Sequence, residues 1–148
     1  MSKIETFVDT NILVYSLDIS LENRSFHRAS LEVLRPSEKE ILYVSPQILA
    51  EFYSVVTSIS AVKNPISPNE AIFRMKRLSQ MPNIKVLEIS HDVEQKWLEL
   101  LETNPVKGSK VFDVFHLATM LTHNIQRIYT FNDSDFSWYK NIHVIIPS

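Results

Sequence analysis

Short apolar runs alternate along the chain with longer segments whose apolar residues recur every three or four positions. The short runs predict strands at 4–8, 41–44, 84–87, 128–131 and 142–146. The longer segments predict helices at 12–17, 21–35, 46 to about 60, 67 or 69 to 81, 90–102 and 112–123. Strands separated by helices predict an α/β fold, a three-layer α/β/α sandwich with a mainly parallel sheet of four to five strands. Residues 1–148 are expected to form a single domain.

The residue types that are scarce in the chain narrow its chemistry. With no cysteine, disulfides, thiolate nucleophiles and cysteine-based zinc sites are excluded. The single glycine, Gly108, excludes phosphate-binding loops, dinucleotide-binding motifs and serine-hydrolase elbows, each of which needs at least two. A His-Glu-x-x-His zinc-protease motif is also missing from the sequence. What remains is chemistry by carboxylates, histidines, hydroxyls or a hard metal ion.

Charge and hydropathy add less. The net charge of −2, from 15 Lys and Arg against 17 Asp and Glu, lacks the basic excess of many nucleic-acid-binding proteins. It does not exclude a nuclease, because a cluster of metal-binding acids lowers the total. No apolar run approaches the roughly 18–20 residues of a membrane span, and the first five residues lack the apolar core of a signal peptide. A cytoplasmic protein with no membrane partner is therefore expected.

Two acidic residues lie in the first half of the chain, one directly after a predicted strand and one inside a predicted helix. Asp9 comes directly after the first predicted strand, where it is either a helix cap or a functional group at the carboxyl end of the sheet. Glu51 lies at the edge of a predicted apolar stripe formed by Ile48, Phe52, Val55 and Ile59. A carboxylate at such an edge either extends into water or faces a site.

Two further acidic positions lie in the second half. Asp113 is on the apolar side of its predicted helix, where an ionised carboxylate is costly unless it is paired or bound, although a helix start also favours an anion. The run from Thr130 to Phe136, which contains Asn132, Asp133 and Asp135, follows the fourth strand directly. Several carboxylates at one sheet edge repel each other unless a cation or shared proton intervenes, and oxygen ligands favour Mg²⁺ or Mn²⁺.

The segments around these acids resemble the motifs of PIN-domain nucleases, especially the VapC-type toxins of prokaryotic toxin–antitoxin pairs. Phe7-Val8-Asp9-Thr10-Asn11-Ile12-Leu13-Val14-Tyr15 resembles the opening motif, Ile48-Leu49-Ala50-Glu51-Phe52 the second, and Phe112-Asp113-Val114-Phe115-His116-Leu117-Ala118 the third. The run 130–136 resembles the fourth, and the resemblance covers nearly the whole chain. Within this last run, Asp135 is favoured as the fourth acid over Asp133, and Asn132 stands where many relatives have an Asp.

The resemblance implies a Mg²⁺- or Mn²⁺-dependent endoribonuclease. Asp9 and Asp113 would bind metal directly, and Glu51 and Asp135 would bind through water or position the nucleophile. Thr10, Asn11 and Thr130 would hold these carboxylates in place. The resemblance also implies a homodimer and inhibition by a cognate antitoxin.

Other interpretations stay open at this point. A DNA nuclease or an RNA-processing enzyme of the same fold has the same motifs, and a non-catalytic interaction module or receiver-like domain needs none of the chemistry. A haloacid-dehalogenase phosphatase is disfavoured because Asn11 stands where its second Asp is usual. His116 and His123 are expected to have hydrogen-bonded structural roles, and Trp97 and Trp138 to be packing residues.

Overall fold

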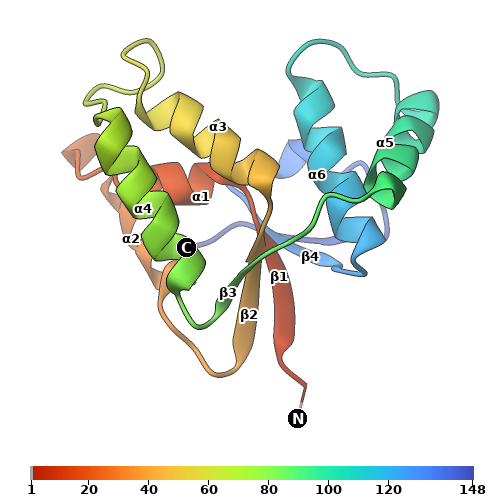
Figure 1. Ribbon diagram of the computed structural model, residues 1–148, viewed down its shortest axis with the longest axis horizontal. Coiled ribbons are helices and arrows are strands. Elements are labelled where there is room, and N and C mark those ends of the chain that lie inside the picture. The colour runs from red at the N-terminus through yellow and green to blue at the C-terminus, as the bar shows by residue number, and fades with distance from the viewer. Residues whose placement is uncertain (1) are drawn as a thin grey trace.

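β1 (Ile4–Val8) lies at the centre of a sheet whose strand order is β3-β2-β1-β4-β5. The computed structural model describes residues 2–148, and Figure 1 shows the arrangement of its elements. The other strands are β2 (Glu40–Val44), β3 (Ile84–Val86), β4 (Arg127–Tyr129) and β5 (His143–Ile145). Every neighbouring pair is parallel, so the prediction of a mainly parallel sheet is confirmed.

Helices cover both faces of the sheet. They are α1 (Thr10–Tyr15), α2 (Arg24–Leu34), α3 (Pro46–Val56), α4 (Pro68–Gln80), α5 (His91–Thr103) and α6 (Lys110–Thr122), with short 3₁₀ turns η1 (Leu21–Asn23) and η2 (Asp133–Asp135). Figure 1 shows α1 to α4 on one side of the sheet and α5 with α6 on the other. The chain runs from β1 outward to β3 and then returns past β1 to β4. Because crossovers between parallel strands are right-handed, this reversal puts α5 and α6 on the face opposite α1 to α4. The predicted three-layer sandwich is confirmed.

Two groups of buried side chains hold the layers together. The larger group joins the sheet to α1, α3 and α4 and includes Phe7, Leu42 and Ile48. The smaller group, centred on Val93 and Leu117, joins α5 to α6. Within residues 2–148, no helix is long and apolar enough to cross a membrane.

Helix starts follow the local signals in the sequence. The Ser45 hydroxyl accepts a hydrogen bond from the Ile48 amide at 3.1 Å, and the Ser67 hydroxyl accepts one from the Glu70 amide at 3.1 Å. A proline in the first turn follows each of these serines, which suits that position because its missing N–H would have no helical partner. Ser67, rather than Asn69, therefore caps α4.

The end of α3 differs from the prediction. The helix stops at Val56 instead of continuing to about residue 60, and Ile59 is 83% exposed outside it. The chain turns because the Thr57 hydroxyl donates to the Tyr53 carbonyl at 2.7 Å and the Ile66 amide donates to the Val56 carbonyl at 2.9 Å. The predicted stripe is therefore confirmed at Ile48 and Phe52, which are buried, and wrong at Ile59. The other predicted elements are present, with small shifts at their ends.

Candidate active site

The carboxyl ends of β1 and β4 lie side by side at the point where the strand order reverses. β1 pairs with β2 on one side and with β4 on the other; the chain reaches β2 and β3 through helices on one face of the sheet and reaches β4 through α5 and α6 on the other face. Such a reversal opens a crevice at the carboxyl ends of the strands, where α/β proteins place their ligands. Asp9 follows β1 and Thr130 follows β4 at this position.

Asp9 is buried at the start of α1, with its carboxylate fixed by three donors. Oδ1 accepts from the Thr10 amide at 2.7 Å, and Oδ2 accepts from the Thr130 hydroxyl at 2.8 Å and the Asn11 amide group at 3.3 Å. The helix-cap interpretation of Asp9 is thus confirmed, and the same residue lies in the crevice. Burial raises the pKa of Asp9, against the attraction of His116 and the bonds from Thr130 and Thr10.

Thr130 and Asn11 connect the two strand ends. Besides donating to Asp9, the Thr130 hydroxyl accepts from the Asn11 side chain at 3.2 Å and from the Asn132 amide at 3.0 Å. The side-chain Oδ1 of Asn11 in turn accepts from the Phe131 backbone amide at 3.3 Å. This network holds the turn after β4 against α1. The Asn132 side chain itself is exposed, so its contribution comes from the backbone.

Glu51, on α3, is bonded inward rather than extended into water. Its Oε2 accepts from the Thr10 hydroxyl at 2.7 Å, and Oε1 accepts from the Gln47 side chain at 3.3 Å. His116 Nε2 lies 3.0 Å from both oxygens. Burial acts to raise the pKa of Glu51, but the hydrogen bonds and charge attraction of His116, with the Thr10 and Gln47 bonds, outweigh it and lower the pKa.

Asp113 lies in the first turn of α6 and faces the other acids. Burial raises its pKa from 3.8 to about 7, with repulsion from Asp135, Asp9 and Glu51 adding to the rise and attraction to His116 opposing it. A carboxylate stabilised only by a helix start would not show this repulsion. Side chains from α1, α3, α6 and the turn after β4 therefore share one electrostatic environment.

The structure separates the two candidates for the fourth acid. Asp135 is half-buried, and among the neighbouring charges it raises the pKa of Asp113 most. Asp133 is exposed, and its charge is not among the influences on Asp113. The η2 turn fixes this orientation, because the Asp135 amide donates to the Asn132 carbonyl at 3.1 Å and Trp138 Nε1 donates to the Asp135 carbonyl at 2.9 Å.

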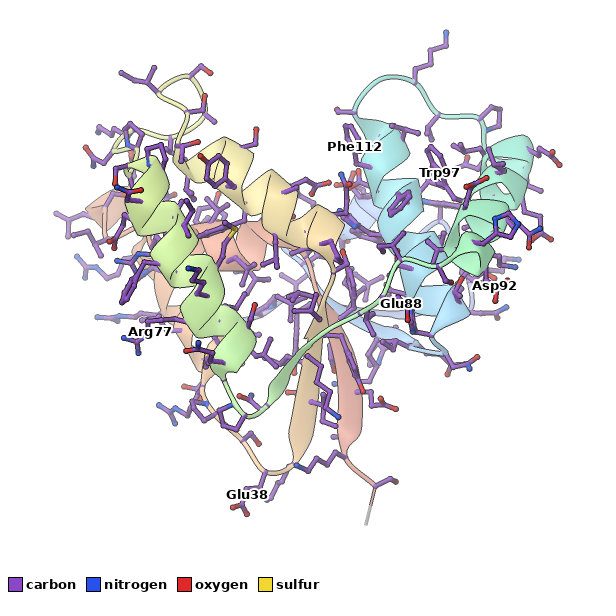
Figure 2. All side chains as sticks on the ribbon, in the orientation of Figure 1. Glu38, Arg77, Glu88, Asp92, Trp97 and Phe112 are labelled. Carbon is purple, nitrogen blue, oxygen red and sulfur yellow. The ribbon has the colours of Figure 1, made fainter. Side chains whose placement is uncertain are left out.

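The expected structural roles of the histidines and tryptophans can be compared with their contacts. His116 is hydrogen-bonded, as expected, but its partner is a candidate site acid, which sequence reasoning missed although His116 is three residues from Asp113. His123 Nε2 lies 2.8 Å from the Glu88 carbonyl oxygen, away from the acids. Figure 2 shows Trp97 between α5 and α6, where it packs on Phe115 as expected. Trp138 is 38% exposed and packs on Tyr139.

These oxygen donors suit a hard divalent cation. Asp9, Asp113 and Asp135 supply carboxylate oxygens. The pKa of Asp113 is raised by burial and by the negative charges of its neighbours, which a bound cation would offset. Within residues 2–148, no group of three or more acidic or histidine side chains is spaced so that it could hold a metal ion as the structure stands. The acids lie together at the carboxyl ends of β1 and β4, the position at which this kind of sheet has its crevice, and a cation there would neutralise part of their charge.

A family model, described as PIN domain, matches residues 6–141. The chain belongs to the PIN domain family. PIN-domain nucleases hydrolyse phosphodiester bonds and generally use divalent metals, which agrees with the acidic crevice. None of the curated proteins compared with this PIN domain matches it in sequence.

Solved structures with the same fold include toxins of toxin–antitoxin systems. Mycobacterium tuberculosis VapC20, described as a sarcin-ricin loop cleaving toxin, is 22% identical with a TM-score of 0.66, covering 97% of this chain and 99% of that one. VapBC2 of Rickettsia felis, solved with a promoter DNA fragment, is 19% identical with a TM-score of 0.65, covering 98% and 100%. VapBC-1 of nontypeable Haemophilus influenzae is 16% identical with a TM-score of 0.64, covering 96% and 97%. This PIN domain has the VapC-like fold over its whole described length.

Proposed function

We propose that this PIN domain is an endoribonuclease that depends on Mg²⁺, with Mn²⁺ as a substitute, and that it is the toxin of a toxin–antitoxin pair. The observation that carries the proposal is the convergence of acids from separate elements: Thr10 donates to both Asp9 and Glu51, and Asp113 on α6 lies close enough to these two and to Asp135 for their charges to raise its pKa. Four acids from separate elements lie in one crevice, where they repel one another. A bound cation would offset this repulsion, whereas packing alone would not.

Asp9 and Asp113 are assigned as the residues that hold the cation. Thr10, Asn11 and Thr130 hold Asp9 so that its carboxylate keeps one orientation, as partners of metal-binding side chains commonly do. A bound cation would supply an activated water and neutralise charge on the phosphate. Glu51 and Asp135 are assigned to water-mediated contacts with the cation or to orienting the attacking water.

A protein antitoxin and a second copy of the chain are the proposed partners. Support for the antitoxin comes from neighbours of the same fold that were solved as toxin–antitoxin complexes, one of them from Klebsiella pneumoniae. The dimer rests on the resemblance to VapC-type toxins alone. Light scattering at micromolar concentration tests it, and a monomer at every concentration would remove the dimer from the proposal.

RNA cleavage by the purified protein tests the activity. Labelled total RNA, intact ribosomes and a DNA of matched length are incubated with the protein in EDTA, then with Mg²⁺ or Mn²⁺. Ribosomes are included because VapC20 is described as a sarcin-ricin loop cleaving toxin. We expect cleavage of RNA that requires added metal and falls by more than about 100-fold in Asp9→Asn.

Asp92→Asn is the matched control for that variant. Asp92 is an exposed acid in the first turn of α5, and Figure 2 shows it on the outermost helix. The control removes one charge from the surface and should cleave at the wild-type rate. Cleavage of DNA instead of RNA would support a DNA nuclease of the same fold, and the absence of any metal-dependent cleavage would refute the proposed function.

A further inference from the structure

We propose that His116 is a positioning residue that sets the orientation of the Glu51 carboxylate by donating from Nε2 to both of its oxygens. The proposal deepens the proposed function, because it concerns one of the four acids of the same crevice. It starts from a contact between two residues 65 positions apart, with Nε2 at 3.0 Å from Oε1 and 3.0 Å from Oε2.

The equal distances define the geometry of the contact. An N–H that bisects the two oxygens of a carboxylate prevents the group from rotating about its terminal bond, since rotation would lengthen one of the two contacts. Thr10 adds a second constraint at Oε2, at 2.7 Å, and Gln47 a weaker one at Oε1, at 3.3 Å. The carboxylate is therefore held from three elements, α1, α3 and α6.

The surroundings of the His116 ring offer it no second hydrogen-bond partner within residues 2–148. Its side chain is fully buried, it lies against the Phe7 ring at a centroid distance of 5.9 Å, and its neighbour Leu117 belongs to the core between α5 and α6. Within residues 2–148, Nδ1 has no hydrogen-bond partner. An apolar side chain would satisfy this position at lower cost, because it would leave no buried nitrogen unpaired. The bond to Glu51 is thus the only hydrogen bond of the His116 ring among the described residues.

The pair also joins the two helical layers at the site. Figure 1 shows α3 and α6 on opposite sides of the sheet, and Glu51 and His116 meet across its carboxyl edge. Asp113 precedes His116 by about one turn on α6. The same helix therefore carries Asp113 and, through His116, contacts Glu51. His116 thereby keeps Asp113 and Glu51 at a fixed separation.

Three single variants test this role first. His116→Leu removes the donor and keeps an apolar side chain, whereas His116→Gln keeps an N–H donor near the Nε2 position. We expect His116→Leu to lower kcat by about 10–100-fold with little change in KM, the usual range for partners that orient metal-binding groups, and His116→Gln to recover most of the loss. His123→Leu removes an imidazole from the end of the same helix, where its partner is the Glu88 carbonyl, and should leave kcat unchanged.

The double variant separates positioning from a general loss of packing. If His116 acts through Glu51, adding His116→Leu to Glu51→Gln should lower kcat by less than threefold. A merely structural role predicts that the two losses multiply, and it predicts no recovery by His116→Gln. Either result would overturn the proposal.

A readout without RNA keeps this proposal distinct from the proposed function. In nuclear magnetic resonance spectra of the protein in EDTA, the Nε2 proton of His116 should exchange slowly with water, as a buried and bonded proton does. The signal is identified by its loss in His116→Gln, and it should lose protection in Glu51→Ala but not in His123→Leu. Protection that persists in Glu51→Ala would refute the positioning role, whether or not the protein cleaves RNA.

Discussion

Asp113→Asn should stabilise this PIN domain in the absence of metal, although it removes a candidate metal ligand. The pKa of Asp113 is raised from 3.8 to about 7 in the folded state, so ionisation of this carboxyl is opposed by folding. Each pKa unit corresponds to about 1.4 kcal/mol, which sets an upper bound of about 4 kcal/mol on the cost. Because the side chain is only half-buried, water screens the repulsion, and we expect a gain of about 1–2 kcal/mol.

The sign of the pH dependence follows from the direction of the shift. A carboxyl group with a raised folded-state pKa stays protonated in the folded protein after it has ionised in the unfolded chain. Wild-type stability should therefore fall as pH rises from about 4 to about 7 and level off above that range. The gain from Asp113→Asn should be complete at pH 8 and smaller at pH 5.5, where the folded-state carboxyl is still partly protonated.

Urea unfolding in EDTA, followed by tryptophan fluorescence at both pH values, measures the effect. Asp92→Asn is the control, because Asp92 also lies in the first turn of a helix and removing it costs the same favourable interaction with the helix dipole. The difference between the two variants isolates the burial and repulsion of Asp113. If Asp113→Asn is no more stable than Asp92→Asn at pH 8, the acids do not repel one another and the description of the crevice is wrong.

Three further changes have defined outcomes. At sub-saturating metal, cleavage should rise with pH through about 7, since a cation must compete with a proton for Asp113, and a flat profile between pH 5.5 and 8 would contradict this. Thr130→Val removes the 2.8 Å bond to Asp9 while keeping the side-chain shape, so cleavage should fall by about 10–100-fold with the circular dichroism spectrum unchanged; wild-type cleavage would show that Asp9 needs no such support. Phe136→Ala empties a fully buried position and should destabilise the protein by about 3–5 kcal/mol, and an unchanged urea midpoint would refute its place in the core.

Local signals predicted most of the fold. Runs of apolar residues located the strands, and serine followed by proline located the starts of α3 and α4, because both signals act within one turn or one strand. The order of the strands depends on pairings between distant segments, which periodicity does not encode. The end of α3 was wrong for a related reason: apolar spacing continues to Ile59, while contacts from Thr57 and Ile66 end the helix.

Part of the candidate site could likewise be predicted from local signals in the sequence, and part could not. Asp9 and Asp113 could be chosen because each lies beside an element whose type and direction are readable from the sequence. Preference for Asp135 over Asp133 could not be derived from spacing, since the short η2 turn decides which of them is half-buried. The partner of His116 was also hidden, because Glu51 lies 65 residues away on the opposite layer.

We propose above all that Asp9 and Asp113 together hold a cation that this PIN domain needs in order to cut RNA. The most direct test is the initial rate of RNA cleavage as a function of Mn²⁺ concentration, measured at pH 8 for the wild type, Asp113→Asn and Asp92→Asn. We expect cleavage by the wild type and by Asp92→Asn to depend on Mn²⁺ and to saturate. For folded Asp113→Asn we expect a rate at least about 100-fold lower than that of the wild type. Wild-type rates and Mn²⁺ dependence in Asp113→Asn would contradict it.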